Sequence, residues 1–308
     1  MTRSEIREDY IHDRAVIIAP KRGKRPHDLK PEPTPPIVHK SDCPFCATRT
    51  AQSPRTLHAV AHRGRWLIRA IKNIFPIVST ENPKAFGHQE VIIETPEHDL
   101  ERADMPTWHI EKLLQVYQHR THSLSRQKRI QYIMIFKNNG GKAGQSLQHA
   151  HSQVFASEYV PPHIVQKLTR IQEHYIKNGR SYYQDLIDGE RNGPRMIAQD
   201  QHMIVFAPYA STYSYEAWIL PKRNVDNIAL LTAQEVRSMA TMLKLLLVKI
   251  DKLQLPYNYY LHQVPHYPDE HLYLRIAPRR DTWAGLELGS RLYVNSVPPE
   301  DAAKYYRS

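Results

Sequence analysis

The chain contains little cysteine and no long hydrophobic run. Only two cysteines, Cys43 and Cys46, occur among its 308 residues. No apolar stretch approaches the roughly 18 residues that a membrane-spanning helix needs. Residues 1–10 are charged and contain no apolar signal core. These absences argue against a membrane span, a secretory leader and a disulfide-stabilised fold, so we expect a cytoplasmic protein.

The charge is unbalanced towards basic side chains. Lys and Arg number 42 against 31 Asp and Glu, which gives a formal net charge of +11. An anionic partner is therefore expected, either nucleic acid, a membrane surface or a phosphorylated small molecule. The aromatic-interleaved basic stripe that single-stranded nucleic acid favours is absent from the sequence. With 41% hydrophobic and 24% charged residues, the chain has the composition of a globular protein with one large or two modest domains.

Two segments of the chain repeat one order of predicted elements. Strands, a long helix and a strand pair are predicted at 65–78, 90–94, 106–124, 131–137 and 149–156, and again at 203–207, 217–220, 232–253, 257–263 and 271–277. The second helix opens with Thr232 and has Glu235 three residues later, the spacing of a capping box. The pattern predicts an α+β fold of two duplicated units, residues 1–165 and 166–308. Each unit should have mainly antiparallel sheet and one long helix.

The two cysteines form the segment Cys43-Pro44-Phe45-Cys46. Thiolates at this spacing can take adjacent corners of a zinc tetrahedron. A redox dithiol and two unrelated buried thiols are the alternatives. The proline and the aromatic residue inside the loop favour a metal site. The missing ligands should be histidines or acids near strand ends, where His98 and His149 stand.

A histidine pair follows a loop that contains glycine. His149, His151 and Gln153 alternate along a predicted strand and should share one face. The glycines of residues 138–146 allow backbone N–H groups to approach a phosphate, and Ser146 and Gln153 add neutral donors. Neutral imidazole beside a phosphate is a nucleophile near pH 7. The His-x-His spacing alone leaves metal binding and nucleophilic catalysis equally open, and the loop favours a nucleotide site.

These residues belong to a longer recognisable pattern, which reads Phe136-Lys137-Asn138-Asn139-Gly140, Gly144-Gln145-Ser146 and His149-Ala150-His151-Ser152-Gln153. The pattern resembles the active-site segment of galactose-1-phosphate uridylyltransferases, which belong to the histidine-triad superfamily and carry two such domains in one chain. Ala150 stands where that family has a proline. Residues 284–289, 293–295 and 299–300 are most similar to the ADP-glucose phosphorylase branch of the family and its uncharacterised bacterial relatives.

The resemblance implies a role for each residue. Cys43, Cys46, His98 and His149 would hold one structural zinc ion. His151 would attack the α-phosphorus of a sugar nucleotide, release sugar 1-phosphate and pass the nucleotide to a phosphate acceptor in a ping-pong reaction. Phosphate oxygens would be held by the side chains of Gln153 and Ser146. Asn73 and Asn138 would contact the base or ribose, and Gly144 would bind substrate in the loop. Arg22 and Arg25 would bind phosphate or belong to a solvated basic loop. Glu287 would contact the sugar across the interface of a homodimer.

The sequence departs from the family at a second metal site that many members have in the C-terminal half. Ser181 and Gln184 stand where two cysteines would fall, and Asn224 replaces a histidine, so only His271 remains. Serine and asparagine are not competent zinc ligands in that setting. We therefore expect one zinc ion per chain rather than two.

The predicted function is transfer of a nucleoside monophosphate from a sugar nucleotide to hexose 1-phosphate or inorganic phosphate. The C-terminal resemblance favours an ADP-sugar with inorganic phosphate over UDP-glucose with a hexose 1-phosphate. A nucleotide hydrolase, a dinucleoside polyphosphate phosphorylase and a non-catalytic nucleotide or nucleic-acid binder are the alternatives. The intact motif at residues 149–153 argues against lost catalysis, and no nucleic-acid or membrane partner is expected.

Overall fold

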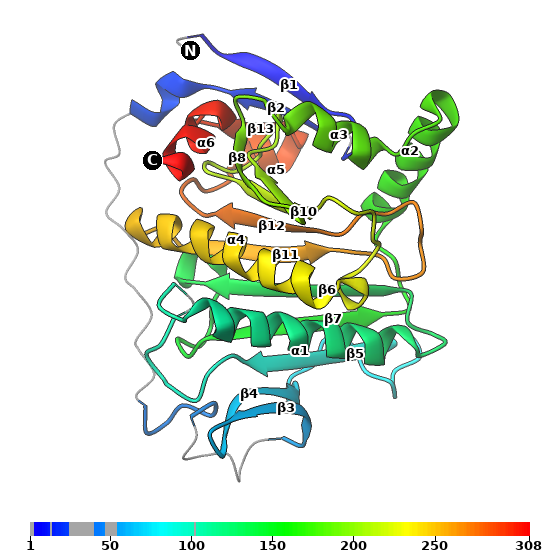
Figure 1. Cartoon of the computed structure of the whole chain (residues 1–308), viewed down its shortest axis with the longest axis vertical. Helices are drawn as coiled ribbons and strands as arrows, with labels where there is room; N and C mark the ends of the chain where they lie inside the picture. Colours follow the sequence, from blue (N-terminus) through cyan, green and yellow to red (C-terminus); the bar gives the residue numbers. More distant parts are fainter. Residues whose placement is uncertain (1–2, 13, 25–39, 47–53, 102) are drawn as a thin grey trace.

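The chain is built around one ten-stranded antiparallel sheet (Figure 1). The computed structural model describes all residues except 1–2, 13, 25–39, 47–53 and 102. Within that part of the chain the sheet runs, from edge to edge, β3 (Thr56–His62), β4 (Arg65–Lys72), β5 (Gly87–Ile93), β7 (His151–Ser157), β6 (Tyr132–Asn139), β11 (Tyr257–His262), β12 (Tyr273–Pro278), β10 (Ala217–Pro221), β9 (Met203–Phe206) and β8 (Met196–Gln199). The predicted mixture of helix and mainly antiparallel sheet is confirmed.

Two long helices cover one face of this sheet. Helices α1 (Thr107–Ser125) and α4 (Ala233–Lys252) lie side by side across the central strands (Figure 1). Their apolar stripes are fully buried against the strands, as at Leu113 and Leu243. The predicted capping box is confirmed, because the Thr232 hydroxyl accepts from the Glu235 N–H and the Glu235 carboxylate accepts from the Thr232 N–H. No helix in the described part of the chain is long and apolar enough to cross a membrane.

The strand order is the same on both sides of the central β6–β11 pair. Outward from the centre, one side runs β6, β7, β5, β4, β3 and the other runs β11, β12, β10, β9, β8. In sequence, α1 lies between β5 and β6, and α4 lies between β10 and β11. Each predicted strand–helix–strand-pair segment therefore forms one side of a continuous sheet.

Two helices between these segments were missed by the sequence analysis. They are α2 (Pro162–Asn178), which ends at Gly179 with φ +68°, and α3 (Tyr182–Glu190). The expected boundary between residues 165 and 166 falls inside α2. Ile164, Leu168 and Ile171 of this helix pack into a second core with strands of the C-terminal side. Residues on both sides of the expected boundary therefore belong to the same core. The division into two domains stays a prediction.

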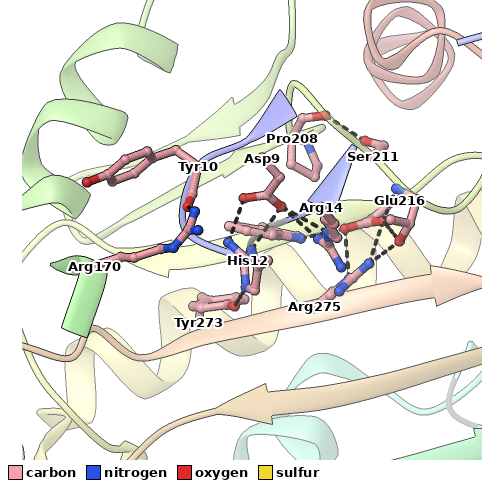
Figure 2. Close-up of polar contacts among 12 residues, drawn as sticks. Asp9, Tyr10, His12, Arg14, Arg170, Pro208, Ser211, Glu216, Tyr273 and Arg275 are labelled. Atoms are coloured by element: carbon pink, nitrogen blue, oxygen red, sulfur yellow. Dashed lines mark hydrogen bonds and ion pairs between the residues drawn. The ribbon is translucent and has the colours of Figure 1, made fainter. Parts of the chain in front are cut away.

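A small sheet joins the N-terminal residues to the C-terminal side. It consists of β1 (Glu5–Asp9), β2 (Arg14–Ile18) and β13 (Tyr293–Asn295), with β13 parallel to β2. Figure 2 shows the turn of the β1–β2 hairpin against β12. There the His12 ring bonds the Asp9 carboxylate through Nδ1 at 2.9 Å and the Tyr273 hydroxyl through Nε2 at 2.9 Å. Burial lowers the pKa of His12 to about 4, so this link is made by a neutral ring at pH 7.

Candidate active site and metal centre

His151 is the first residue of β7 and points away from the two long helices. Val154 lies in the core beneath α1, and the Ser152 hydroxyl accepts a 2.7 Å hydrogen bond from the Tyr117 hydroxyl of that helix. Because successive side chains of a strand alternate between faces, His151 and Gln153 lie on the opposite face of the sheet. That face therefore carries the site.

The imidazole of His151 is held in one tautomer. Its Nδ1 lies 2.8 Å from the carbonyl oxygen of His149, which can only accept, so Nδ1 carries the hydrogen and Nε2 does not. The side chain is 6% exposed, and burial lowers its pKa to about 4. The ring is therefore neutral at pH 7 with an unprotonated Nε2, which is the form that a nucleophilic histidine requires.

A cavity of about 410 Å³ opens beside this ring. Four of the predicted site residues line it together: Asn73, Ser146, His151 and Gln153. Apolar side chains complete the wall, among them Phe45 of the cysteine loop and the 82% exposed Phe75. Cavities of this size with a largely apolar wall and few convergent polar groups are typical of small-molecule sites.

Side-chain amides brace the loop that the sequence analysis assigned to phosphate binding. The Gly140 N–H donates to Gln145 Oε1 at 2.6 Å. Asn258 Nδ2, from β11, donates to Asn138 Oδ1 and to the Ala143 carbonyl oxygen, both at 2.8 Å. Asn138 lies in this brace and not in the cavity wall, and its contact with a base or ribose stays a prediction. The sequence contains no signal for Asn258, because its partners are more than a hundred positions away.

The two glycines that flank the short turn η3 (Gly141–Ala143) have left-handed backbones. Gly140 has φ +84° and Gly144 has φ +83°. A Cβ at Gly140 would also lie 2.9 Å from the Pro256 ring. Glycine is therefore required for the path of the chain at Gly140, while Gly144 is exposed and open for an approaching ligand.

The four predicted metal ligands meet in one buried group. The ligand atoms of Cys43, Cys46, His98 and His149 all lie within 4.8 Å of one another. His149 Nδ1 lies 3.6 and 3.7 Å from the two sulfurs, and His98 Nδ1 lies 3.3 Å from Cys46 Sγ. Zinc bonds of about 2.3 Å to sulfur and about 2.0 Å to nitrogen would place S and N about 3.5 Å apart in a tetrahedron. The group fits a tetrahedral metal ion.

The surroundings of this group also fit a cation. His149 Nε2 lies 2.8 Å from the Thr95 carbonyl oxygen, so it carries the hydrogen and leaves Nδ1 to face the metal position. Burial and the neighbouring Cys43 raise the pKa of the Cys46 thiol to about 11. A bound cation is what converts such buried thiols to thiolates.

The structure corrects one detail of the histidine motif. The strand begins at His151, two residues later than predicted, and His149 lies in a bend. The Thr95 carbonyl holds the His149 ring outside the ladder, so only His151 and Gln153 share a strand face. The two histidines of one motif thus point to different partners.

Arg22 and Glu287 line a different, smaller cavity. This space of about 120 Å³ lies between η1 (Pro20–Lys24) and α5 (Gly285–Ser290), and no residue lines both cavities. In Figure 1, α5 and β13 lie at the opposite end of the molecule from β3 and β4. Arg25 is outside the described residues. Within one chain, Glu287 therefore does not join His151 in a common site.

The residues at the position of the family's second metal site form hydrogen bonds within the protein. His271 Nδ1 lies 3.0 Å from Asn224 Oδ1, and His271 Nε2 lies 2.8 Å from the Pro221 carbonyl oxygen. Gln184 donates to Asp188. Both ring nitrogens of His271 thus have partners from the chain itself.

Known proteins resemble this chain along its whole length. Residues 70–161 match the family model of the galactose-1-phosphate uridyl transferase N-terminal domain. An ADP-glucose phosphorylase from Arabidopsis thaliana is 33% identical over 98% of this chain and 92% of that protein. The chain belongs to the galactose-1-phosphate uridylyltransferase family. A galactose-1-phosphate uridylyltransferase from Thermotoga maritima is 28% identical over 98% of both chains.

A solved structure agrees with this membership. The crystal structure of the Arabidopsis ADP-glucose phosphorylase with bound ADP-glucose has a TM-score of 0.88 and 31% identity, and each chain covers 99% of the other. The uridylyltransferase family segment at residues 70–161 contains His98, His149, His151 and Gln153, while Cys43 and Cys46 precede it. The chain is a nucleotidyltransferase of this family, with a histidine-triad-like fold.

Gly140→Ala should destabilise the loop beside the cavity. The added Cβ would clash with Pro256, and alanine would have to adopt a left-handed backbone conformation. This lowers the free energy of unfolding by about 1–3 kcal/mol. We expect a lower midpoint of urea unfolding. Gly189→Ala, a helical position of α3 with open space around its Cβ, is the matched control and should not lower the midpoint. An unchanged midpoint for Gly140→Ala would contradict the close packing against Pro256.

Proposed function

We propose that the chain transfers a nucleoside monophosphate from a sugar nucleotide to a phosphate acceptor through a covalent nucleotidyl-histidine at His151. The observation that carries this proposal is one cavity lined by His151, Gln153 and Ser146, in which His151 has an unprotonated Nε2. A metal-binding histidine would need no such donors around it. Membership of the family supports the same chemistry.

In the first step, Nε2 attacks the α-phosphorus of the donor and forms a P–N bond. The bond from this phosphorus to the bridging oxygen breaks, and sugar 1-phosphate leaves with the electron pair. The His149 carbonyl, which accepts from Nδ1–H, stabilises the positive charge that develops on the ring. Gln153 and Ser146 donate to the phosphoryl oxygens. In the second step a phosphate oxygen of the acceptor attacks phosphorus, the P–N bond breaks and neutral His151 is restored.

The donor we favour is an ADP-sugar, with inorganic phosphate as acceptor. The 33% identical relative is an ADP-glucose phosphorylase. The residues around Glu287 also resemble that branch. A UDP-sugar with a hexose 1-phosphate acceptor is the second candidate, supported by the relative from Thermotoga maritima. The mostly apolar wall around Asn73 suits a flat base of either kind.

The metal at Cys43, Cys46, His98 and His149 is proposed to be one structural zinc ion per chain. Two thiolates and two imidazoles are a preferred zinc donor set, and four protein ligands leave no position for substrate. Zinc bound there would fix the His149 backbone, whose carbonyl orients the nucleophile. The chain's own contribution is therefore a rigid acceptor for Nδ1–H of His151.

The two sides of the sheet are proposed to be duplicated histidine-triad-like domains, residues 1–165 and 166–308. The common strand order and the equivalent places of α1 and α4 support this. Along β12 and the residue pair before it, His271, Tyr273 and Arg275 alternate as His149, His151 and Gln153 do. Tyr273 bonds His12 and replaces the nucleophile, so only the N-terminal domain is proposed to be catalytic.

A homodimer is proposed because Glu287 and Arg22 are separated from His151 within one chain. The exposed apolar side chains of Ile74 and Phe75 line the cavity of His151, and those of Leu286 and Leu288 flank Glu287 in the sequence of α5. Two copies that pair these surfaces would bury them and bring Glu287 of one chain to the sugar bound at His151 of the other.

Incubation with ADP-glucose or UDP-glucose in the absence of acceptor should leave an acid-labile adduct on the protein. Intact mass should increase by the mass of AMP or UMP, and the productive donor identifies the base. His151→Ala should abolish the adduct, because no nucleophile remains. His122→Ala, an exposed histidine of α1, is the control and should retain it. Absence of an adduct from any sugar nucleotide would refute the covalent mechanism, and hydrolysis without transfer would indicate a hydrolase.

Metal analysis of the purified chain should find close to one zinc ion per chain. Cys46→Ser should remove it and lower the thermal unfolding midpoint, because a buried ligand set is broken. Asn224→Ala should change nothing in the metal content, since Asn224 already occupies the place of a lost ligand. A content of two zinc ions would show that our interpretation of Ser181, Gln184 and Asn224 is wrong.

Subunit complementation tests the shared site. Homodimers of His151→Ala and of Glu287→Ala should both transfer poorly. A heterodimer, co-expressed with two affinity tags, should recover up to half of wild-type activity, because one of its two sites has His151 and the partner's Glu287 intact. The pair His151→Ala with Gln153→Ala is the matched control and should not recover, since both residues line one cavity. No recovery for Glu287→Ala would contradict a site that is shared between two copies of the chain.

A further inference from the structure

Gln89 of β5 is a buried amide that the mechanism above does not use. It is 8% exposed and does not line the cavity of His151, but it lines a second cavity of about 310 Å³ together with Pro76 and Val78. Three of its atoms bond to parts of the candidate active site. They are Nε2, Oε1 and the backbone carbonyl oxygen.

The side-chain nitrogen of Gln89 determines how Gln153 presents its amide. Gln89 Nε2 donates to Gln153 Oε1 at 3.0 Å. With its oxygen engaged there, the Gln153 carboxamide keeps its NH₂ group for a ligand in the cavity that Gln153 lines. Phosphate oxygens only accept hydrogen bonds, so this orientation is the one that stabilises a phosphoryl group. The opposite orientation would place a carbonyl oxygen against an anion.

The two oxygens of Gln89 hold the 73–77 loop, which lines the cavity of His151. The Ile77 N–H donates to Gln89 Oε1 at 2.8 Å, and the Asn73 N–H donates to the Gln89 backbone oxygen at 3.0 Å. The residues between these anchors include Asn73, Ile74 and Phe75, which line the cavity. One residue therefore fixes both ends of the 73–77 loop.

We propose that Gln89 is a positioning residue that couples the nucleoside-binding loop to the phosphate donor of Gln153. The proposal rests on the proposed function, since it assigns a nucleoside to residues 73–77 and a phosphoryl group to Gln153. A nucleoside that orders the loop maintains the hydrogen bond from the Ile77 N–H to Gln89 Oε1. This bond fixes the Gln89 amide so that its Nε2 donates to Gln153. Recognition at one end of the donor is thereby linked to transition-state stabilisation at the other.

The chemistry requires a side chain with one acceptor and one donor at this position. In Gln89→Glu the carboxylate still accepts from Ile77, but it has no hydrogen for Gln153 Oε1. It attracts the Gln153 NH₂ group instead and turns the amide over. Gln89→Leu loses both contacts. Gln89→His keeps one donor and one acceptor on its ring.

The test measures the single-turnover rate of nucleotidyl-histidine formation and the Michaelis constants of transfer. Gln89→Glu should form the adduct about 100-fold more slowly with an unchanged KM, because one phosphate donor is lost while the loop anchor remains. Gln89→Leu should show the same loss of rate and a raised KM. Gln89→His should recover to within about tenfold of wild type. The matched control is His88→Ala, a neighbour on the other face of β5, which should leave both constants unchanged.

A double-mutant cycle separates positioning from a general structural effect. Gln153→Ala alone and Gln89→Glu alone should each slow adduct formation about 100-fold, and the double variant should be no slower than Gln153→Ala. Additive losses, or a Gln89→Glu variant with wild-type rate, would overturn the role of Gln89 while the wild-type adduct still supports the proposed function. Absence of the adduct from the wild type would overturn both. Equal zinc content and thermal unfolding midpoints establish that the variants are folded. If Gln89→Glu does not fold, the rate of Gln89→His is compared with that of Gln89→Leu.

Discussion

The hydrogen bond from His151 Nδ1 to the His149 carbonyl connects the proposed nucleophile to the candidate metal centre. The nucleophile needs one nitrogen free and the other protonated, and a backbone carbonyl enforces this because it cannot donate. The same residue that offers the carbonyl directs its side chain into the metal group. A displacement of His149 would therefore release the tautomer of His151 as well as a metal ligand. In the proposed function, the structural metal and catalysis are therefore coupled through the backbone of one residue.

A buried ion pair supports this arrangement from the helix side of the sheet. Lys137 Nζ lies 3.1 Å from Glu94 Oε2 and 3.3 Å from a Glu101 carboxylate oxygen, and both Lys137 and Glu94 are fully buried. Burial raises the pKa of Glu94 to about 7 against the opposing effect of Lys137. Glu94 immediately precedes Thr95, whose carbonyl orients His149. Loss of Lys137 would remove the cation that faces the buried Glu94 carboxyl, one residue before the carbonyl that orients His149.

Local sequence patterns predicted the parts of the site whose chemistry is carried by residue type. A glycine-bearing loop and a His-x-His-x-Gln run predicted Ser146, His151 and Gln153 of the cavity, and two cysteines at the right spacing, with histidines near strand ends, predicted the metal group. Asn73 of the cavity was predicted only through the family resemblance. The capping box at Thr232 is likewise a local pattern. Gln89 and Asn258 were not predictable, because an amide gains its role from the orientation of partners on other strands. Helix α2 was missed because its apolar residues, such as Ile164 and Leu168, become a core only against distant strands.

The small sheet has a consequence for the order in which the chain can fold during synthesis. Strand β2 pairs with β13, so residues 14–18 cannot complete this pairing until residues 293–295 have been synthesised. The turn of the β1–β2 hairpin likewise waits for Tyr273. A segment that is synthesised long before its partner strand is thus among the last to be completed. Until then the hairpin exposes an unpaired strand edge, the type of surface that chaperones protect from association with other nascent chains.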